Sequence, residues 1–350
     1  QMMNGAIAHL REGLRTENKT ELQSRMTSLE QAASKWLRPY PNPGIRDNVK
    51  ELLVAVTVIL SFTTFFLQLT KIPTGSLQPT LFGITYTNLI SRPDAVIPGR
   101  MQRILDYWIK GIQYFHVEAQ AEGYLVVQPP RRVFPFIKKQ TLVIGGKSHT
   151  MWFVNDELTA RAGLHSGMQF RKGDDVIKMK VVAGDHLFVD RITYNFRKPE
   201  RGEIIVFKTK GIEPLPQNQL YIKRLVALGG ERVRIGDDQR LIINDRRLDA
   251  STPRFENVYT FDPTQRPENS YFGHANARVG RKFGSDHVAP LFPDERAEFL
   301  VPENGYLAMG DNTLNSSDSR SWGAVPEQNV IGKAWLVYWP ITERFGFGYR

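Results

Sequence analysis

The chain has 350 residues, of which 41% are hydrophobic, and a formal net charge of +10. It contains no cysteine, which excludes disulfides, thiolate nucleophiles and cysteine-ligated metals. The basic residues are interleaved with acidic ones and form no long run. The net positive charge is therefore better explained by contact with a lipid surface, or by solubility, than by binding to nucleic acid.

Residues 1–50 are expected to form a polar helix followed by a linker. Apolar residues recur every three or four positions from Leu22 to Trp36, with charged residues between them. Such a stripe fits contact with a partner helix, contact with a membrane, or a solvated helix with no further role. The stretch "RPYPNPG", residues 38–44, contains too much proline to continue a helix and is interpreted as the linker.

Residues 51–71 are expected to cross a membrane. The stretch from Leu52 to Leu69 carries no charge and would span roughly 27 Å as a helix, close to the thickness of a bilayer's hydrocarbon core. A buried core helix is the alternative interpretation. Three basic residues precede the stretch closely and only Lys71 follows it closely, which predicts a cytoplasmic N-terminus. The chain opens at Gln1 rather than at a methionine, so a preceding segment or second span is left open.

Beyond the span the pattern changes to short β-branched and alternating runs, which are typical of strands. Clear examples are "DHLFVDRITYNF", "GEIIVFK", "YIKRLVAL" and "AWLVYWP". The predicted fold class is therefore a mainly β region, made of residues 72–82 and 182–350, behind an N-terminal transmembrane helix. Two insertions interrupt this region: a mixed α/β insertion over residues 83–181, and a loop-like one over residues 250–299 that is rich in proline, asparagine and glycine.

A helix is predicted within the first insertion, from Gly99 to about Val117. Its apolar stripe, close to a 3.6-residue period, comprises Met101, Ile104, Leu105, Trp108, Ile109, Ile112 and Phe115. In one interpretation this stripe packs on the β core of the insertion. In the other it lies in the lipid interface, with Trp108 at the level of the headgroups.

The chemistry depends on one serine and one lysine. The sequence contains no HExxH or other metal-spacing motif, no GxSxG elbow, no P-loop and no dinucleotide motif, so no metal or cofactor is expected. Ser76, in "IPTGSLQPTL", therefore lacks a Ser-His-Asp context. A neutral lysine can also activate a serine when burial lowers the lysine's pKa. Lys223 lies in an apolar strand, where alternation places it on one face with Tyr221 and Leu225; a solvated lysine on an edge strand is the alternative.

Four sequence boxes, in order behind the apolar span, resemble those of the type I signal peptidases, or leader peptidases. The stretch "IPTGSLQPTL" resembles the serine box, and "GDHLFVDRITY" with "RGEIIVF" resembles the strand boxes that follow. "YIKRLVALGGE" resembles the lysine box, and Met309 to Ala334 resembles the Gly-Asp-Asn box. Residues 1–43, most of 83–181, and 250–299 are not covered, so the long separation of Ser76 from Lys223 is a feature that the resemblance does not explain.

The resemblance implies a membrane-anchored serine endopeptidase that removes signal peptides from exported preproteins after small residues, in an Ala-x-Ala pattern, with a Ser/Lys dyad. It implies a mainly β fold in a bacterial inner (plasma) membrane protein, single-pass in this chain, with the catalytic region on the periplasmic side. The implied partners are signal peptides and membrane lipid, with no nucleic acid.

Carried over residue by residue, the resemblance makes Ser76 the nucleophile and Lys223 the general base. Thr74 would join the Ser76 backbone N–H in the oxyanion hole, and Ser316 would orient the lysine. Asp318 and Arg320 would support the loop that carries Ser316. The residues implied to line or flank the substrate pockets are Ile72, Leu77, Leu81, Val206, Tyr221 and Ile222.

Two other functions remain alternatives. One is a catalytically inactive, membrane-anchored binding or scaffold protein on the same fold, against which the intact set of Ser76, Lys223, Thr74 and Ser316 argues. The other is a soluble, self-cleaving Ser/Lys regulator, against which the apolar span and the lack of a DNA-binding motif argue.

Overall fold

The computed structural model describes residues 2–13, 19–36, 42–92, 94–135, 137–260, 273–285 and 287–347. The chain divides into two compact units, Gln1–Phe62 and Thr63–Arg350. Residues 37–41 of the predicted linker and residues 261–272 and 286 of the second insertion lie outside the described residues.

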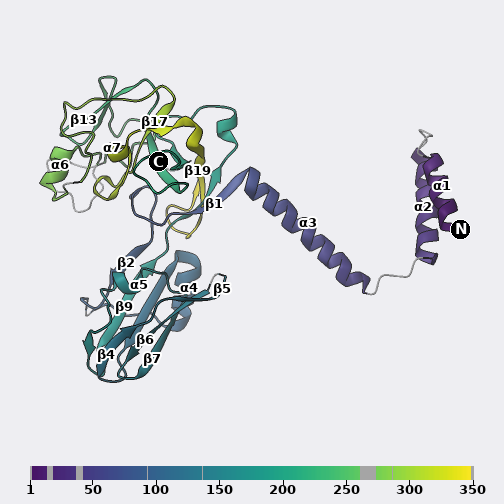
Figure 1. Ribbon diagram of the computed structural model, residues 1–350, viewed down its shortest axis with the longest axis horizontal. Coiled ribbons are helices and arrows are strands. Elements are labelled where there is room, and N and C mark those ends of the chain that lie inside the picture. Colours follow the sequence, from purple (N-terminus) through teal and green to yellow (C-terminus); the bar gives the residue numbers. More distant parts are fainter. Residues whose placement is uncertain are drawn as a thin grey trace. The chain divides into compact units, whose positions relative to one another are not determined.

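The first unit is helical. Helices α1 (Met2–Gly13) and α2 (Lys19–Trp36) lie side by side, and Arg25 of α2 donates a hydrogen bond of 2.7 Å to the His9 carbonyl of α1 (Figure 1). Helix α3 runs over Pro43–Phe65, so the helix predicted over residues 51–71 begins earlier and ends earlier than expected, and Leu67–Lys71 form a strand instead. Among the described residues, α3 alone is long and apolar enough to cross a membrane: its most apolar 18 residues have a mean hydropathy of 1.5, and none of them is buried. This exposure argues against the alternative of a buried core helix.

The second unit is built on an eight-stranded antiparallel sheet. The strand order is β1-β10-β19-β11-β12-β17-β18, with β20 paired to β19. The bounds are β1 (Leu67–Lys71), β10 (His186–Asp190), β11 (Ile204–Lys208), β12 (Leu220–Ala227), β17 (Gly305–Met309), β18 (Val325–Pro326), β19 (Val330–Trp339) and β20 (Gly346–Phe347). The predicted β-branched runs thus form this sheet, because their alternating apolar side chains are buried on both of its faces.

A smaller sheet and the second insertion form another core beside it. The order is β15-β14-β13-β16, from β13 (Arg232–Ile235), β14 (Leu241–Ile243), β15 (Arg246–Arg247) and β16 (Phe299–Leu300). Within residues 250–299, Phe255, Val258 and Phe292 are buried against this sheet, and helix α6 (Ala277–Lys282) begins where the Asn276 side chain accepts from the Val279 N–H. The described part of this insertion is rich in loops and also carries core residues.

The first insertion is a β structure with two helices. It comprises β2 (Thr85–Asn88), α4 (Arg100–Lys110), β3 (Ile112–Glu118), β4 (Gly123–Val127), β5 (Arg131–Phe134), β6 (Ile137–Ile144), β7 (Lys147–Trp152), α5 (Leu158–Arg161), β8 (Gln169–Phe170) and β9 (Asp175–Val182). Its strands form two sheets, β2-β9-β3 and β5-β6-β4-β8, with β7 paired to β6 (Figure 1).

The insertion leaves and re-enters the main sheet region at one point. The Phe82 N–H donates to the Asp185 carboxylate at 2.7 Å, and the Asp185 N–H donates to the Phe82 carbonyl at 2.8 Å. The Asp185 carbonyl in turn accepts from the Ile72 N–H at 2.9 Å. The residues on either side of the insertion are therefore tied to each other and to the segment that follows β1.

The helix predicted from Gly99 to about Val117 is too long. Helix α4 ends at Lys110 because Gly111 takes a left-handed conformation, with φ of 66°, which few other residues adopt at low cost. Ile112 and Phe115 lie on strand β3, where Phe115 joins the core of the insertion. The remaining stripe does not pack on that core, since Met101 is 74% and Trp108 is 69% exposed.

Candidate active site

Ser76 and Lys223 meet inside the second unit. Ser76 follows β1, and Lys223 lies on β12, between β11 and β17. Lys223 Nζ donates a hydrogen bond of 2.7 Å to Ser76 Oγ, and the two residues are 5% and 6% exposed. The alternative of a solvated lysine on an edge strand is wrong, because β12 is an interior strand.

The surroundings of Lys223 favour its neutral form. Burial lowers the pKa of Lys223 from its ordinary value of 10.5 to about 8, since the charged ammonium is desolvated. Asp318 and Asp311 act in the opposite direction, and Arg320 adds to the lowering. At pH 7 about a tenth of the molecules then carry a neutral amine, which is able to take a proton from the serine hydroxyl.

Backbone contacts hold the serine segment in place. The Asn312 side chain donates to the Gly75 carbonyl at 2.9 Å, and the Asn312 N–H donates to the Ser76 carbonyl at 3.0 Å. On the other side Gly83 lies directly against Thr74, where a Cβ atom would come within 2.1 Å of the Thr74 carbonyl. The segment is thus clamped between the loop after β17 and the start of the first insertion.

Gly310 is a second close approach, and its replacement provides a test. A Cβ at Gly310 would lie 2.4 Å from the Ser76 carbonyl oxygen and 2.3 Å from Ser316 Oγ. Gly310→Ala should therefore displace Ser76 and lower kcat by about 10²-fold, a typical cost of misplacing a reacting group by about 1 Å. Gly99→Ala is the matched control, since nothing lies within 4 Å of its added methyl group. An unchanged kcat in Gly310→Ala would show that Ser76 does not need this position.

A buried ion pair connects the serine segment, the lysine strand and the loop after β17. Arg224 donates to Asp311 through Nε at 2.7 Å and Nη2 at 2.6 Å, and both side chains are fully buried. The Thr80 hydroxyl donates to Asp311 at 2.5 Å and accepts from Arg224 at 2.9 Å. Sequence reasoning assigned no role to these three residues, although an arginine inside an apolar strand was a signal that it has a buried partner.

Asp318 and Arg320 form a second buried pair. Arg320 reaches Asp318 with two nitrogen atoms, at 2.8 Å and 2.7 Å, and donates to the Thr313 carbonyl at 2.8 Å. Burial raises the pKa of Asp318, but the Arg320 charge and hydrogen bonds outweigh it and hold that pKa below its ordinary value. The Gly310 N–H also donates to Asp318, at 3.0 Å, so this pair braces both ends of the loop that carries Ser316.

The side chains of Ser316 and Thr74, which were predicted to assist catalysis, make no hydrogen bond with Ser76 or Lys223 among the described contacts. Ser316 Oγ is buried and has no hydrogen-bond partner among the described residues. Thr74, two residues before the serine, is exposed. Their roles, in orienting the lysine and in the oxyanion hole, stay predictions.

The residues predicted to bind substrate fall into two groups. Five belong to one apolar cluster on one face of the sheet, namely Ile72, Leu77, Leu81, Val206 and Ile222. Tyr221 lies on the opposite face of β12, where its ring is 5.9 Å from Lys223 Nζ. Of these six residues, Ile222 and Tyr221 are partly exposed and the other four are buried, so the predicted contact of those four with substrate stays a prediction.

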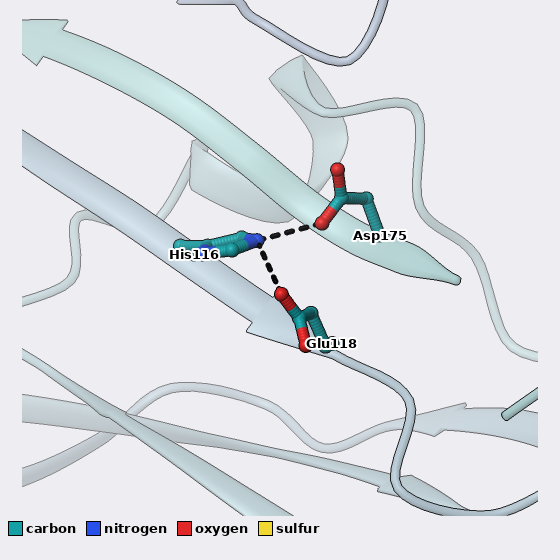
Figure 2. A group of neighbouring side chains, drawn as sticks. All are labelled: His116, Glu118 and Asp175. Carbon is teal, nitrogen blue, oxygen red and sulfur yellow. Dashed lines mark hydrogen bonds and ion pairs between the residues drawn. The ribbon is translucent and has the colours of Figure 1, made fainter. Parts of the chain in front are cut away.

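One group of side chains on the first insertion has the donor atoms of a metal site. His116 and Glu118 alternate on β3, and Asp175 lies on the neighbouring strand β9, with donor atoms within 4.8 Å of one another (Figure 2). Sequence spacing missed this group because Asp175 joins it only through strand pairing. Both carboxylates approach the same atom, His116 Nε2, at 2.6 Å and 3.4 Å, so in this arrangement they pair with the histidine itself.

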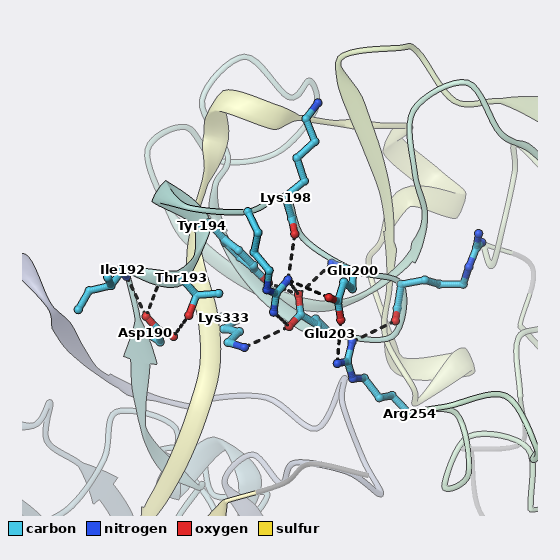
Figure 3. Close-up of polar contacts among 11 residues, drawn as sticks. Asp190, Ile192, Thr193, Tyr194, Lys198, Glu200, Glu203, Arg254 and Lys333 are labelled. Carbon is cyan, nitrogen blue, oxygen red and sulfur yellow. Dashed lines mark hydrogen bonds and ion pairs between the residues drawn. The ribbon is translucent and has the colours of Figure 1, made fainter.

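A polar cluster fastens β11 to β19. Glu203, just before β11, accepts from Arg197 at 2.5 Å and from Lys333 of β19 at 3.2 Å, and Tyr194 donates to it at 3.1 Å (Figure 3). Burial raises the pKa of Glu203, but these donors outweigh it and lower that pKa to about 2. The carboxylate therefore stays charged and paired, which fixes the strand next to the one that carries Lys223.

The site combines a buried serine with a lysine of lowered pKa, on an antiparallel sheet. This pair of side chains is typical of the Ser/Lys hydrolases. The family described as signal peptidase, peptidase S26, matches residues 175–339. Signal peptidase I of Pseudomonas fluorescens is 30% identical over 245 residues, which cover 61% of this chain and 80% of that protein. The chain belongs to the signal peptidase family.

Other relatives match a smaller part of the chain. Signal peptidase I of Leptolyngbya laminosa is 34% identical, over 45% of this chain and 62% of that protein. The probable signal peptidase I-2 of Synechocystis is 28% identical, over 45% of this chain and 56% of that protein. The match thus spans less than two thirds of the length of these two relatives. A crystal structure of a signal peptidase I from Enterococcus faecalis is 27% identical, over 39% of this chain and 97% of that chain, with a TM-score of 0.25.

Proposed function

We propose that this protein is a membrane-anchored serine endopeptidase that removes signal peptides from exported preproteins. The hydrogen bond of 2.7 Å between Lys223 Nζ and Ser76 Oγ, two residues that are 5% and 6% exposed, is the observation that carries the proposal. Membership of the signal peptidase family supports the substrate class. Helix α3 supports the anchor, since it ends at Phe65, only eleven positions before Ser76.

In the proposed reaction the neutral Lys223 amine accepts the hydroxyl proton of Ser76 as Oγ attacks the scissile carbonyl. The resulting ammonium then gives its proton to the leaving amine, which leaves an acyl group on Ser76. A water molecule, deprotonated by the same amine, releases the acyl group and restores the serine. The backbone N–H of Ser76, with the Thr74 hydroxyl, would stabilise the oxyanion; each such donor is worth about 3 kcal/mol.

The proposed site is next to the membrane on the side opposite the N-terminus. Arg38 precedes α3, and Arg46 and Lys50 lie in its first part, ahead of the uncharged stretch, which favours a cytoplasmic N-terminus and a periplasmic second unit. This geometry suits the substrate, because a signal peptide is itself an apolar segment whose cleavage site emerges near the bilayer surface.

Incubation of the full chain with a preprotein in detergent, followed by N-terminal sequencing of the product, tests the function. One new N-terminus, at the end of the signal peptide, is the expected result. No cleavage of any of several preproteins would favour the alternative of an inactive binding protein on the same fold.

A second expectation concerns specificity. Cleavage should need small side chains one and three residues before the cut, as the resemblance to the signal peptidases implies for the pockets assigned to Ile72, Val206 and Ile222, which belong to one apolar cluster. Replacing either substrate alanine by phenylalanine should remove most of the activity, as measured by kcat/KM. A phenylalanine introduced two residues before the cut is the matched control and should be tolerated. Equal cleavage of alanine and phenylalanine substrates at the first position would refute the assigned pocket.

A further inference from the structure

Helix α4 is amphipathic, but its apolar face is exposed and a polar side chain is buried, the reverse of the usual arrangement in a soluble protein. The side chain that it buries is Asp106, which accepts from Gln102 at 3.0 Å and pairs with Lys110 at 3.2 Å. The apolar face points outward, with exposed fractions of 43–74% for Met101, Ile104, Leu105, Trp108 and Ile109. A surface helix normally turns its apolar stripe to the core, so this face is built to meet something other than water.

A basic and aromatic groove runs along the same helix. It encloses about 610 Å³ and is lined by Arg100, Arg103 and Trp108 of α4 together with Phe153. Phe153 is 55% exposed and holds a left-handed backbone, with φ of 58°, which is unusual for a bulky residue. Two guanidinium groups beside aromatic rings and an apolar helix face match the chemistry of an anionic lipid headgroup above acyl chains.

Helix α4 is also tied to the sheet that contains the strand after α3. The Trp339 indole at the end of β19 donates to the Trp108 carbonyl at 2.8 Å, and the Ile341 N–H donates to the Ile109 carbonyl at 2.7 Å. Trp339 pairs with His186 of β10, and His186 pairs with Lys71 of β1. Helix α4 therefore meets the sheet beside the last residue of β1, roughly 13 Å along that strand from the end that follows α3.

We propose that α4 is an interfacial helix whose apolar face lies in the surface of a bilayer, with Arg100 and Arg103 on anionic phospholipid headgroups. The basic charge of the chain, +10 overall, complements such a surface. The helix would give the second unit a second point of attachment to the membrane, separate from the span. A second copy of the chain and the signal peptide are the other occupants that an experiment has to distinguish.

The absence of cysteine from the chain allows a direct test. A nitroxide spin label is attached to Leu105→Cys, on the apolar face, and the full chain is reconstituted in vesicles of phosphatidylethanolamine and phosphatidylglycerol. Collision rates with oxygen, which concentrates in lipid, and with a water-soluble nickel chelate report the depth of the label. Lys147→Cys, at the exposed first residue of β7 in the same insertion, is the matched control.

The expected result is a label at Leu105 that collides several-fold more with oxygen than with nickel, while the label at Lys147 stays exposed to water. Replacing both arginines (Arg100→Gln with Arg103→Gln), or using phosphatidylcholine vesicles, should move the Leu105 label toward water. A Leu105 label that is water-exposed in the anionic vesicles would overturn the proposal. So would dipolar broadening between labels, which indicates a second copy, or protection only after a signal peptide is added. The readout does not depend on peptidase activity, so it fails independently of the proposed function.

Discussion

Ser76→Ala and Lys223→Ala are each expected to lower the rate of preprotein cleavage by about 10⁴-fold or more while leaving the fold intact. Either change removes one half of the contact through which the proposed mechanism transfers the hydroxyl proton. Lys223→Arg should fail as well, because a guanidinium does not release its proton at accessible pH. Cleavage assays on the purified variants, with circular dichroism as the control for folding, measure the effect. Near wild-type turnover in Lys223→Ala would refute the Ser/Lys mechanism.

The pH dependence gives this prediction a second readout. With a Lys223 pKa of about 8, kcat/KM should rise with pH through that value and then level off. Stability should follow the same group: the pKa is about 10.4 in the unfolded chain, so the unfolded state binds more protons between pH 8 and pH 10.4. Stability from this group therefore rises across that window, and the folded state is penalised by about 3 kcal/mol at pH 7. Lys223→Met should abolish this dependence, as measured by denaturant unfolding at several pH values.

Asp311→Ala should be the most destabilising single change in the described part of the site. It leaves the Arg224 guanidinium fully buried without its carboxylate, and it removes the partner of Thr80. Breaking a buried pair in this way typically costs about 3–5 kcal/mol. For a chain of this size the melting temperature should then fall by roughly 10 °C, which thermal unfolding in detergent can measure.

An exposed pair and a double variant serve as controls for this effect. Glu157 and Arg161 lie 3.0 Å apart with both side chains about 60% exposed, so Glu157→Ala should cost less than about 1 kcal/mol. The double variant of Arg224→Met with Asp311→Leu replaces the pair by apolar groups and should recover part of the lost stability. A double variant that is as unstable as Asp311→Ala would show that the cost comes from lost packing rather than from a stranded charge.

Much of the fold could be predicted from local pattern. The β-branched runs are strands because alternation and turn residues bound them. The uncharged stretch predicted an apolar helix, but not that the helix ends at Phe65 or that Leu67–Lys71 form a strand. The alternation of β12 placed Lys223 with Tyr221 and Leu225 on one face, and the register with β11 agrees. The pairing of that lysine with Ser76, however, came from the resemblance to a family, since pattern alone left a solvated lysine open.

The features of the fold and of the site that could not be predicted depend on contacts between distant segments. Asp311 lies 87 residues from Arg224 in the chain, so nothing local to either residue indicates their pairing. The period of α4 predicted an apolar face but not the direction in which it points, because that depends on contacts with distant segments, such as those of the Trp108 and Ile109 carbonyls with Trp339 and Ile341. Its end was missed because Ile112 and Phe115 continue a helical spacing by coincidence on the next strand.

The hydrogen bonds between Phe82 and Asp185 bring the two ends of the first insertion together. Ser76 and Lys223 are 147 residues apart in the chain, yet most of that length leaves and returns at this one point beside the serine segment. The distance between the two side chains therefore does not depend on the length of the insertion, although α4 also contacts the main sheet through Trp339. A shorter or longer insertion with the same two ends would leave the Ser76–Lys223 contact in place.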